Sequence, residues 1–507
     1  EILRCLVGSE MCIRDSNKGG SFRRWYGNQD YVIDWENDGF RLKNFRDDKG
    51  KQRSTLRSIE FNFMQAITMS RIGSGITSFR LLPKGFITEG ASNNIYFAGK
   101  YENLLGFLNS KVCDYILELY NPTINVMPDD LRNLPLTYLQ TSVNCENEVD
   151  DSVSIAQKDW DSFERSWDFQ HHPLLRKVST IAEAFNQWQD ECEERFNQLK
   201  ANEEELNRIF IGIYGLQDEL TPEVEEKDVT VCKADLGRDI RSFISYAVGC
   251  MFGRYSLYKD GLIFAGEPYS LQAFVDKMNE RPNTISEAEI NRAYYHEGVS
   301  ISEMFAPDVD NIIPICDDEY FEDDIVGLFV EFVKTVYGAD TLDENLIFIA
   351  DALGGKGQPK DVIRNYFLNE FYSDHCKIYQ KRPIYWLFDS GKQNGFKALI
   401  YLHRYTPDTI GNLRVDYLHK MQRVYESEIN RMQDMIDHST NTREVAAATK
   451  RKEKLQKQLK ECRDYDEMIA HLALSRIELD LDDGVKVNYE KIQTASDGKK
   501  YPVLDKI

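Results

Sequence analysis

Residues 104–136 read LLGFLNSKVCDYILELYNPTINVMPDDLRNLPL, a helical pattern followed by the loop that ends it. The spacing of the apolar residues predicts an amphipathic helix with one buried face. Those residues are Leu104, Leu105, Leu108, Val112, Tyr115, Ile116 and Leu119. Pro122 ends this helix, because proline has no amide hydrogen and its ring clashes with the preceding turn.

The loop Asn121-Pro122-Thr123-Ile124 differs by two residues from a catalytic Asn-Pro-Pro-aromatic loop. Enzymes that modify adenine need a loop of that kind, whose polar atoms accept from the amine while its ring stacks on the flipped base. The second proline and the aromatic residue are both absent from this loop. The sequence therefore favours a loop that only ends the helix.

The segment before this stretch is predicted to be rich in β-strands, and the segment after it mostly helical. Strand-like runs at Tyr31–Ile33, Phe79–Leu82 and Ile95–Phe97 are separated by turn signals such as Asp47-Asp48-Lys49-Gly50. Helical spacing continues at 181–209, 324–337, 342–353 and about 412–475. An Asp260-Gly261 turn predicts a β-hairpin.

These patterns predict an α+β fold that is mostly helical. The expected parts are a β-rich domain at 17–137, an acidic linker at 138–160, a helical spacer at 161–231, a mixed and mainly helical domain at 232–405 with a hairpin near 253–266, a long helical segment at 406–476, and a loose tail at 477–507. Residues 1–16 do not begin with Met and resemble translated adaptor, so we expect them not to be native.

Composition narrows the class of protein. No apolar run approaches the roughly 18 residues of a membrane span, which predicts a soluble protein. The ten cysteines form no C-x-x-C pair, and no histidine spacing suggests zinc, so neither disulfides nor a metal site are expected and a reducing cytoplasm fits. The net charge is −22, yet between Asn17 and Leu136 there are 16 Lys and Arg against 13 Asp and Glu. A polyanion would therefore be attracted by the first segment and repelled by most of the rest.

Three other segments resemble parts of active sites but lack the necessary context. Phe210–Gly215 continues a helical stripe instead of following a strand, as a cofactor-binding glycine turn does. In Gly354-Gly355-Lys356-Gly357 no Ser or Thr follows the lysine, so we expect a loop between helices. Asp374-His375-Cys376 are neighbours in sequence, whereas catalytic partners converge from different elements. No catalytic, cofactor-binding or metal-binding residue is predicted.

Binding remains as the function that the residues support. Arg and Lys side chains on loops can reach phosphates, and Arg can read guanine in the major groove. A solvated turn region is the alternative, because several Asp and Glu residues dilute the charge. The candidate DNA contacts are Arg23, Arg24, Trp25, Tyr26, Lys43, Arg46, Lys49, Arg53, Arg57, Arg80 and Lys84.

The pattern L-L-G-F-L-N-S-K, a helix, N-P-T and then D-L-R-N-L-P-L resembles the end of a target-recognition domain in type I specificity subunits and fused restriction-modification methyltransferases. Longer stretches resemble the C-terminal portion of the adenine-specific DNA methyltransferases of BREX phage-resistance systems, the PglX type. These are FRRWYGNQDYVIDWENDG (22–39), FRLLPKGFI (79–87), DWDSFERSWDF (159–169), LNRIFIGIYGLQDELTPEVE (206–225), VGCMFGRYSL (248–257), KRPIYWLFDSGKQNGFKALIYLHRY (381–405) and LDLDDGVKVNY (479–489).

The resemblance implies methylation of adenine in a short DNA site, with S-adenosylmethionine as cofactor and other BREX proteins as partners. In that family the cofactor and N-P-P-Y motifs precede the recognition region. They are absent from this sequence, so we expect a fragment that recognises double-stranded DNA and is inactive alone. Two alternatives stay open: a helical scaffold that assembles partner proteins without reading bases, and an intact enzyme with an unfamiliar site.

Overall fold

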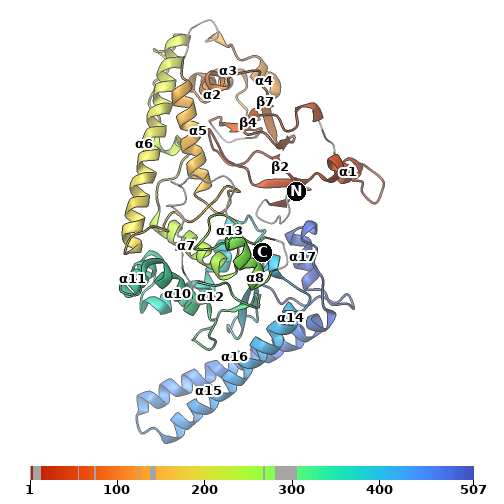
Figure 1. The fold of residues 1–507 in the computed structure, drawn as a ribbon, viewed down its shortest axis with the longest axis vertical. Helices are drawn as coiled ribbons and strands as arrows, with labels where there is room; N and C mark the ends of the chain where they lie inside the picture. Colours follow the sequence, from red (N-terminus) through yellow and green to blue (C-terminus); the bar gives the residue numbers. More distant parts are fainter. Residues whose placement is uncertain are drawn as a thin grey trace. The chain divides into compact units, whose positions relative to one another are not determined.

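The computed structural model describes Ile2–Leu3 and residues 13–507, apart from positions 55, 57, 73–75, 124, 138–143, 266–268 and 280–304. The fold is α+β and mostly helical, as the sequence predicted (Figure 1). It divides into two compact units. The first is made largely of residues 13–169 and Asn186–Asp235, and the second of Gln170–Phe185 and Leu236–Ile507. Within the described ranges, no helix has both the length and the apolar character that crossing a membrane requires.

The first unit contains two small sheets. One has the order β1 (Ile2–Leu3), β3 (Tyr31–Asp34), β2 (Ile13–Asn17) and β6 (Phe86–Thr88). The other has the order β5 (Phe79–Leu82), β4 (Ala66–Ser70) and β7 (Ser92–Ile95), and all of its pairings are antiparallel. The strands predicted at Tyr31 and Phe79 are confirmed, whereas β7 begins three residues before the predicted strand and ends at Ile95. Residues 13–16, which the sequence analysis set aside, are part of β2.

The predicted helix at 104–119 is broken into α2 (Glu102–Leu108) and α3 (Lys111–Tyr120). At the break, the amide of Asn109 donates to the carbonyl of Phe79 and accepts from its N–H, at 3.0 and 2.9 Å. Ser110 then caps α3 by accepting from the N–H of Cys113 at 3.4 Å. The Asn-Ser pair thus ends one helix, starts the next and ties both to β5.

The segment predicted as an acidic linker is mostly a helix in the structure. From Glu146 on it forms helix α5 (Glu146–Asp161), whose apolar side chains enter the core of the first unit. Val149, Val153, Ala156 and Trp160 recur three or four residues apart and are buried. Acidic residues such as the exposed Asp150 and Asp151 separate these apolar positions, so the segment was predicted to be a linker. The long stripe at 181–209 is confirmed as part of α6 (Ile181–Tyr214).

The second unit surrounds a small antiparallel sheet with helices. The sheet has the order β8 (Ile313–Pro314), β10 (Lys397–Tyr401) and β9 (Tyr385–Asp389). The helices are α7 (Leu236–Met251), α8 (Leu271–Asn279), α10 (Ile325–Tyr337), α11 (Leu342–Ala352), α12 (Pro359–Asn369), α13 (Phe371–Ile378), α14 (Thr409–Asn412), α15 (His419–His438), α16 (Thr442–Ser475) and α17 (Val485–Ile492). The helices predicted at 324–337 and 342–353 are confirmed, and the loop Gly354–Gly357 joins α11 to α12.

Two expectations for this unit need correction. Residues 253–265, the described part of the predicted hairpin, contain no strand; instead, apolar side chains such as Leu257 and Phe264 are buried beside the Asp260-Gly261 turn. The tail is not loose, because Val503 is buried and its carbonyl accepts from the N–H of Asp389 at 3.1 Å. The tail therefore packs on the edge of β9.

The predicted segment at 406–476 is helical but folds back on itself. Helices α15 and α16 run side by side and are joined at Ser439–Asn441 (Figure 1). Asn441 caps α16 by accepting from the N–H of Arg443 at 3.0 Å. Buried Tyr425 and Leu455 are among the apolar side chains that pack this pair, which we call the helical arm.

The Asp374-His375-Cys376 segment lies on α13, and its histidine is buried as a neutral group. The His375 Nε2 accepts from the N–H groups of Ile384 and Tyr385, both at 3.1 Å. Burial, with the nearby charge of Arg254, lowers the pKa of His375 to about 3. The imidazole therefore helps to fix the start of β9, and the segment is structural.

This histidine makes the stability of the second unit depend on pH. Histidine in an unfolded chain has a pKa of about 6.5, whereas His375 in the folded chain has a pKa of about 3. Between these two pH values, the unfolded chain therefore holds one more proton, on His375, than the folded chain. The contribution is complete above pH 6.5 and is lost on acidification, by up to about 1.4 kcal/mol per pH unit. We expect His375→Gln to reduce the slope of unfolding free energy against pH by about one proton, measured by urea unfolding between pH 7 and 5. The exposed His438→Gln is the matched control, and an unchanged slope in His375→Gln would contradict the assignment.

Candidate nucleic-acid interface

Five of the eleven candidate DNA contacts lie in the interior of the first unit. Arg23, Arg24, Trp25, Tyr26 and Arg80 are each at most 9% exposed. Their side chains contact other parts of the same chain, so in this structure they present almost no surface to a ligand. We infer that their role is to hold the first unit together.

Arg23 joins the start of the β-rich region to α5. Its Nη2 lies 2.8 Å from the Asp159 carboxylate and 2.9 Å from the carbonyl of Ala156, and its Nε donates to the carbonyl of Tyr26 at 2.7 Å. A side chain at Gly27 would meet Arg23, because a Cβ built there lies 2.4 Å from the Arg23 Nε. Gly27 also has a φ of +118°, which favours glycine.

Arg24 and Trp25 reach two further helices. Arg24 lies between Asp114 of α3 and Glu203 of α6, at 3.2 and 3.5 Å. The Trp25 Nε1 donates to the same Glu203 at 2.7 Å. Burial raises the pKa of Glu203 although Arg24 and Trp25 oppose it, and the pKa of Asp114 is raised for the same main reason. We call these six side chains the buried clamp: Arg23, Arg24, Trp25, Asp114, Asp159 and Glu203.

The clamp also extends the second sheet. The N–H of Trp25 donates to the carbonyl of Phe79 at 2.9 Å, and the carbonyl of Trp25 accepts from the N–H of Leu81 at 2.8 Å. Trp25 thus pairs along the free edge of β5. The intervening Arg80 donates from Nη1 to the carbonyl of Arg23 at 3.2 Å. Burial, followed by the charge of Arg23, lowers the pKa of Arg80 to about 10. Arg80 is thus a buried part of the sheet.

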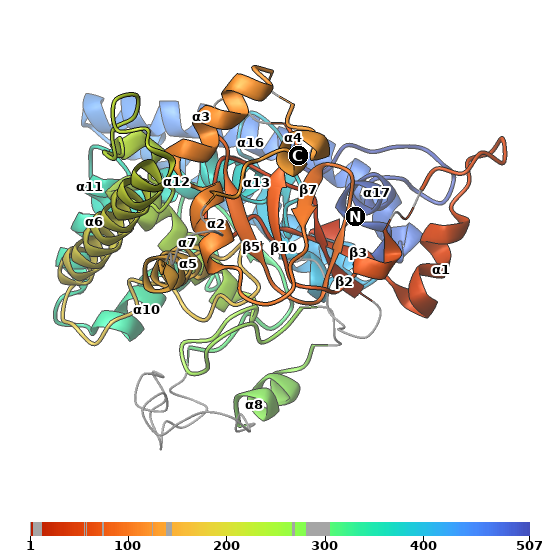
Figure 2. The same cartoon turned by 90° about the horizontal axis from the view of Figure 1, so that it is seen from above.

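The exposed candidates gather on one loop. Lys43, Arg46, Lys49 and Arg53 are exposed within residues 41–53, which we call the basic loop; it comprises the last turn of α1 (Glu36–Asn44) and the loop that follows this helix (Figure 2). Lys84 is exposed in the turn between β5 and β6, and Arg57 lies outside the described residues. The loop contains six Lys and Arg against two Asp. Its charge is therefore available to a polyanion.

The basic loop is held in a defined turn. The N–H of Arg53 donates to the carbonyl of Phe45 at 2.9 Å, and the N–H of Asp47 donates to the carbonyl of Lys51, also at 2.9 Å. The Asp47 carboxylate accepts from the N–H groups of Lys49 and Lys51 at 3.0 and 2.8 Å, and also pairs with Arg53 at 2.9 Å. The turn signal at Asp47–Gly50 is thus confirmed, and its acidic residue organises the cations that surround it.

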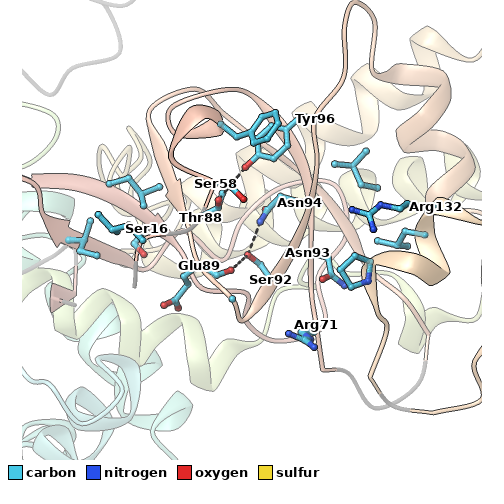
Figure 3. A pocket seen from close by; sticks show the side chains of 18 of the residues that line it. Ser16, Ser58, Arg71, Thr88, Glu89, Ser92, Asn93, Asn94, Tyr96 and Arg132 are labelled. Carbon is cyan, nitrogen blue, oxygen red and sulfur yellow. Dashed lines mark hydrogen bonds between the residues drawn. The ribbon is translucent and has the colours of Figure 1, made fainter. Parts of the chain in front are cut away.

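A cavity of about 1100 Å³ lies beside the basic loop in the same unit (Figure 3). Arg53 lines it together with polar side chains from β6, β7 and α4 (Pro128–Arg132). These polar lining residues are Ser16, Ser54, Ser58, Arg71, Thr88, Glu89, Ser92, Asn93, Asn94, Tyr96 and Arg132. Apart from Ser16 and Arg132, all of them come from the segment between the basic loop and the quoted stretch.

Hydrogen bonds fix one wall of this cavity. Buried Asn17 donates from Nδ2 to Thr68 at 2.6 Å and to Asn94 at 2.9 Å. The Asn94 Nδ2 donates to Ser92 at 3.2 Å, and the Asn93 Nδ2 to the carbonyl of Val126 at 2.8 Å. The amides are therefore held on the sheet instead of on mobile loops.

Three lining side chains that keep exposed surface, Arg71, Asn94 and Arg132, are of the kinds that read base edges. Ser16, Ser92 and Asn93 are each at most 7% exposed and serve to support them. Arg suits guanine, Asn suits adenine, and Ser or Thr can contact either. Arg71, Asn94 and Arg132 were not among the predicted contacts, because single polar residues do not form a cluster of cations and aromatics in the sequence. The run of consecutive polar residues Ser92-Asn93-Asn94 just before an apolar stretch was the available signal.

The glycine-rich segments do not fit S-adenosylmethionine. Such a cofactor needs a glycine turn between the end of a strand and the start of a helix. Phe210–Tyr214 instead completes α6, and Gly354–Gly357 lies between two helices. Across the part of the chain that the structure describes, no cluster of His, Cys, Asp or Glu could hold a metal ion.

The chain is similar to two curated methyltransferases, although no protein-family model matches it. It is 43% identical over 493 residues to the adenine-specific methyltransferase PglX of Lacticaseibacillus casei (strain Zhang), covering 94% of this chain and 38% of that protein. It is 33% identical over 500 residues to the adenine-specific methyltransferase BrxX of Escherichia coli O9:H4 (strain HS), covering 94% and 39%. The chain thus spans less than two fifths of the length of the curated relatives that it matches. Over nearly all of its own length it is homologous to the C-terminal part of adenine-specific methyltransferases of the PglX and BrxX type, as its sequence predicted.

Proposed function

We propose that this chain recognises double-stranded DNA for a site-specific adenine methyltransferase. The observation that carries the proposal is the basic loop beside a cavity lined with base-reading side chains, in a relative of adenine-specific methyltransferases. The loop contacts phosphates and sets the orientation of the duplex, and the cavity side chains contact base edges. Lys43, Arg46, Lys49, Arg53 and Lys84 are the phosphate contacts in this proposal.

The rest of the reaction is also a proposal. S-adenosylmethionine would supply the methyl group, and residues outside the matched part of the relatives would hold it. The protein would act in the cytoplasm beside other proteins of a BREX phage-defence system. The buried clamp keeps the cavity in one shape by joining its supporting sheet to α3, α5 and α6.

The proposal predicts a charge-dependent loss of DNA binding. We expect the triple variant Lys43→Gln, Arg46→Gln and Lys49→Gln to bind a 30-base-pair duplex about 10-fold more weakly at low salt. Each lost phosphate contact also lowers the slope of log affinity against log salt by about 0.9. Fluorescence anisotropy of a labelled duplex over a KCl series measures both quantities.

A matched control removes three exposed or partly exposed lysines from the helical part of the same unit: Lys158→Gln, Lys200→Gln and Lys227→Gln. It changes the net charge by the same amount and should leave the salt slope close to that of the parent. If the loop variant and the control bind DNA equally, the first unit does not use the basic loop. The scaffold alternative, in which the helical part of the chain assembles partner proteins without any reading of bases, would then be favoured.

A further inference from the structure

A basic surface interrupts the acidic second unit on the helical arm. Residues 443–460 of α16 contain seven Lys and Arg against two Asp and Glu, although the chain as a whole has a net charge of −22. Lys450, Lys457 and Lys460 are exposed, and no hydrogen bond or ion pair of their side chains occurs among the described residues. We call these three residues the basic stripe.

The stripe lies on one face of the helix. Positions seven and ten residues apart fall on the same side of an α-helix, and ten residues span about 15 Å. The opposite side carries Leu455 and Leu459, which are buried against the rest of the unit. Glu453 is the only acidic residue from 450 to 460, and it is exposed on the same face between Lys450 and Lys457. The stripe therefore presents three lysines against one glutamate on one side of a rigid helix.

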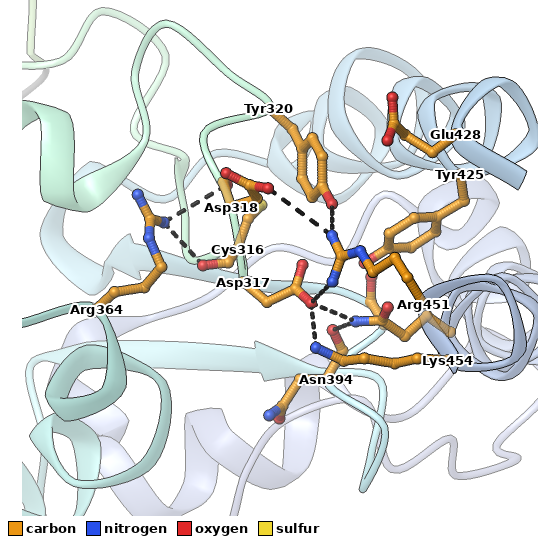
Figure 4. A network of polar contacts seen from close by, with 12 residues as sticks. Cys316, Asp317, Asp318, Tyr320, Arg364, Asn394, Tyr425, Glu428, Arg451 and Lys454 are labelled. Atoms are coloured by element: carbon orange, nitrogen blue, oxygen red, sulfur yellow. Dashed lines mark hydrogen bonds and ion pairs between the residues drawn. The ribbon is translucent and has the colours of Figure 1, made fainter. Parts of the chain in front are cut away.

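Three of the other four cations of this region already have partners. Arg451 and Lys454 both contact the Asp317 carboxylate, at 3.1 and 2.5 Å (Figure 4). Lys452 donates to Gln433 of α15. These contacts fasten α16 to the unit, and Asp317 offsets part of the charge of Arg451 and Lys454. The lysines of the stripe make no comparable contact that would fasten the helix.

We propose that the basic stripe binds the phosphate backbone of duplex DNA without reading bases. Duplex DNA is the polyanion that the proposed function already brings to this chain, and it carries one charge per about 1.7 Å of its axis. A straight helix with three free lysines can follow such a backbone, whereas the acidic surface around it repels DNA elsewhere. This inference concerns a second surface, and it stands apart from the basic loop of the first unit.

The test uses the whole chain and a 30-base-pair duplex of random sequence. We expect Lys450→Gln, Lys457→Gln and Lys460→Gln together to lower affinity about 5- to 10-fold and to reduce the salt slope by about two to three. The matched control is Lys356→Gln, Lys360→Gln and Lys486→Gln, three exposed lysines of the same unit. It should keep the parent slope. Circular dichroism melting of each variant shows whether the arm remains folded.

The proposal is overturned if the stripe variant and its control bind the duplex equally. The stripe would then be a solvated face or a surface for an acidic protein. Failure of the proposed function looks different, because the basic-loop variant would then match its own control while the stripe variant still loses affinity. The two triple variants together separate the two outcomes.

Discussion

Replacing Asp159 by alanine is expected to destabilise the first unit by about 3–5 kcal/mol. The Arg23 guanidinium, whose side chain is 10% exposed, would lose the carboxylate that lies 2.8 Å from it. An unpaired buried charge costs far more than the pair itself contributes. The N–H of Cys232, which donates to the same carboxylate at 2.9 Å, would lose its partner as well. Urea unfolding, followed by the fluorescence of Trp25 and Trp160 near the site, measures the loss.

Two further variants separate the buried charge from other causes. Asp34→Ala breaks the pair between Asp34 and Arg41, whose side chain is 70% exposed, and should cost less than about 1 kcal/mol. Arg23→Met with Asp159→Leu removes both charges and should recover most of the stability that Asp159→Ala loses. If Asp159→Ala is no worse than Asp34→Ala, the clamp does not hold the unit together.

The clamp also changes how DNA-binding experiments should be designed. Substituting Arg23 or Arg24 by alanine tests folding, because both side chains are buried and paired with carboxylates. Loss of DNA binding in such a variant would not identify a DNA contact. The exposed cations of the basic loop are the informative positions for DNA binding, because their side chains are not packed in the core.

The residue pattern predicted the helices better than it predicted the surface. The stripe over 181–209 specified α6 correctly, because one apolar face repeats over many turns. Val149 and Trp160 also repeat at helical spacing, but the many acidic residues of α5 suggested a linker instead. The Asn109-Ser110 break was invisible to periodicity, because it depends on a hydrogen bond to Phe79 in a strand far away in sequence.

The same limit applies to the candidate site. Arg23-Arg24-Trp25-Tyr26 looked like a surface for DNA because cations next to aromatics are common there. Their carboxylate partners are 90 to 179 residues away, at Asp114, Asp159 and Glu203, so local sequence could not show that the cations are buried. The basic loop was found correctly as an exposed turn because Asp47–Gly50 specifies it locally.

The second large effect is expected at Asp317, where the buried group is the carboxylate. Asp317 is 9% exposed at its side chain, whereas Arg451 and Lys454 are 29% and 49% exposed. Burial acts to raise the pKa of Asp317, but Lys454 and Arg451 outweigh it and the pKa is lowered. These cations therefore stabilise the charged carboxylate in the folded unit, and this stabilisation is lost as the pH falls through its depressed pKa.

Removing the cations should thus cost more than removing the acid. We expect Arg451→Met with Lys454→Met to destabilise the attachment of α16 by about 3–5 kcal/mol, because a buried charge then keeps only Gln458 as a partner. Asp317→Asn should cost less, about 1–2 kcal/mol, because water can reach both cations that it leaves behind. The control Arg463→Met with Arg431→Met breaks two exposed pairs of the arm and should cost about 1 kcal/mol or less. Hydrogen exchange of the α16 amides measures all three, and equal losses in the cation variant and the control would show that the arm is held by its apolar face alone.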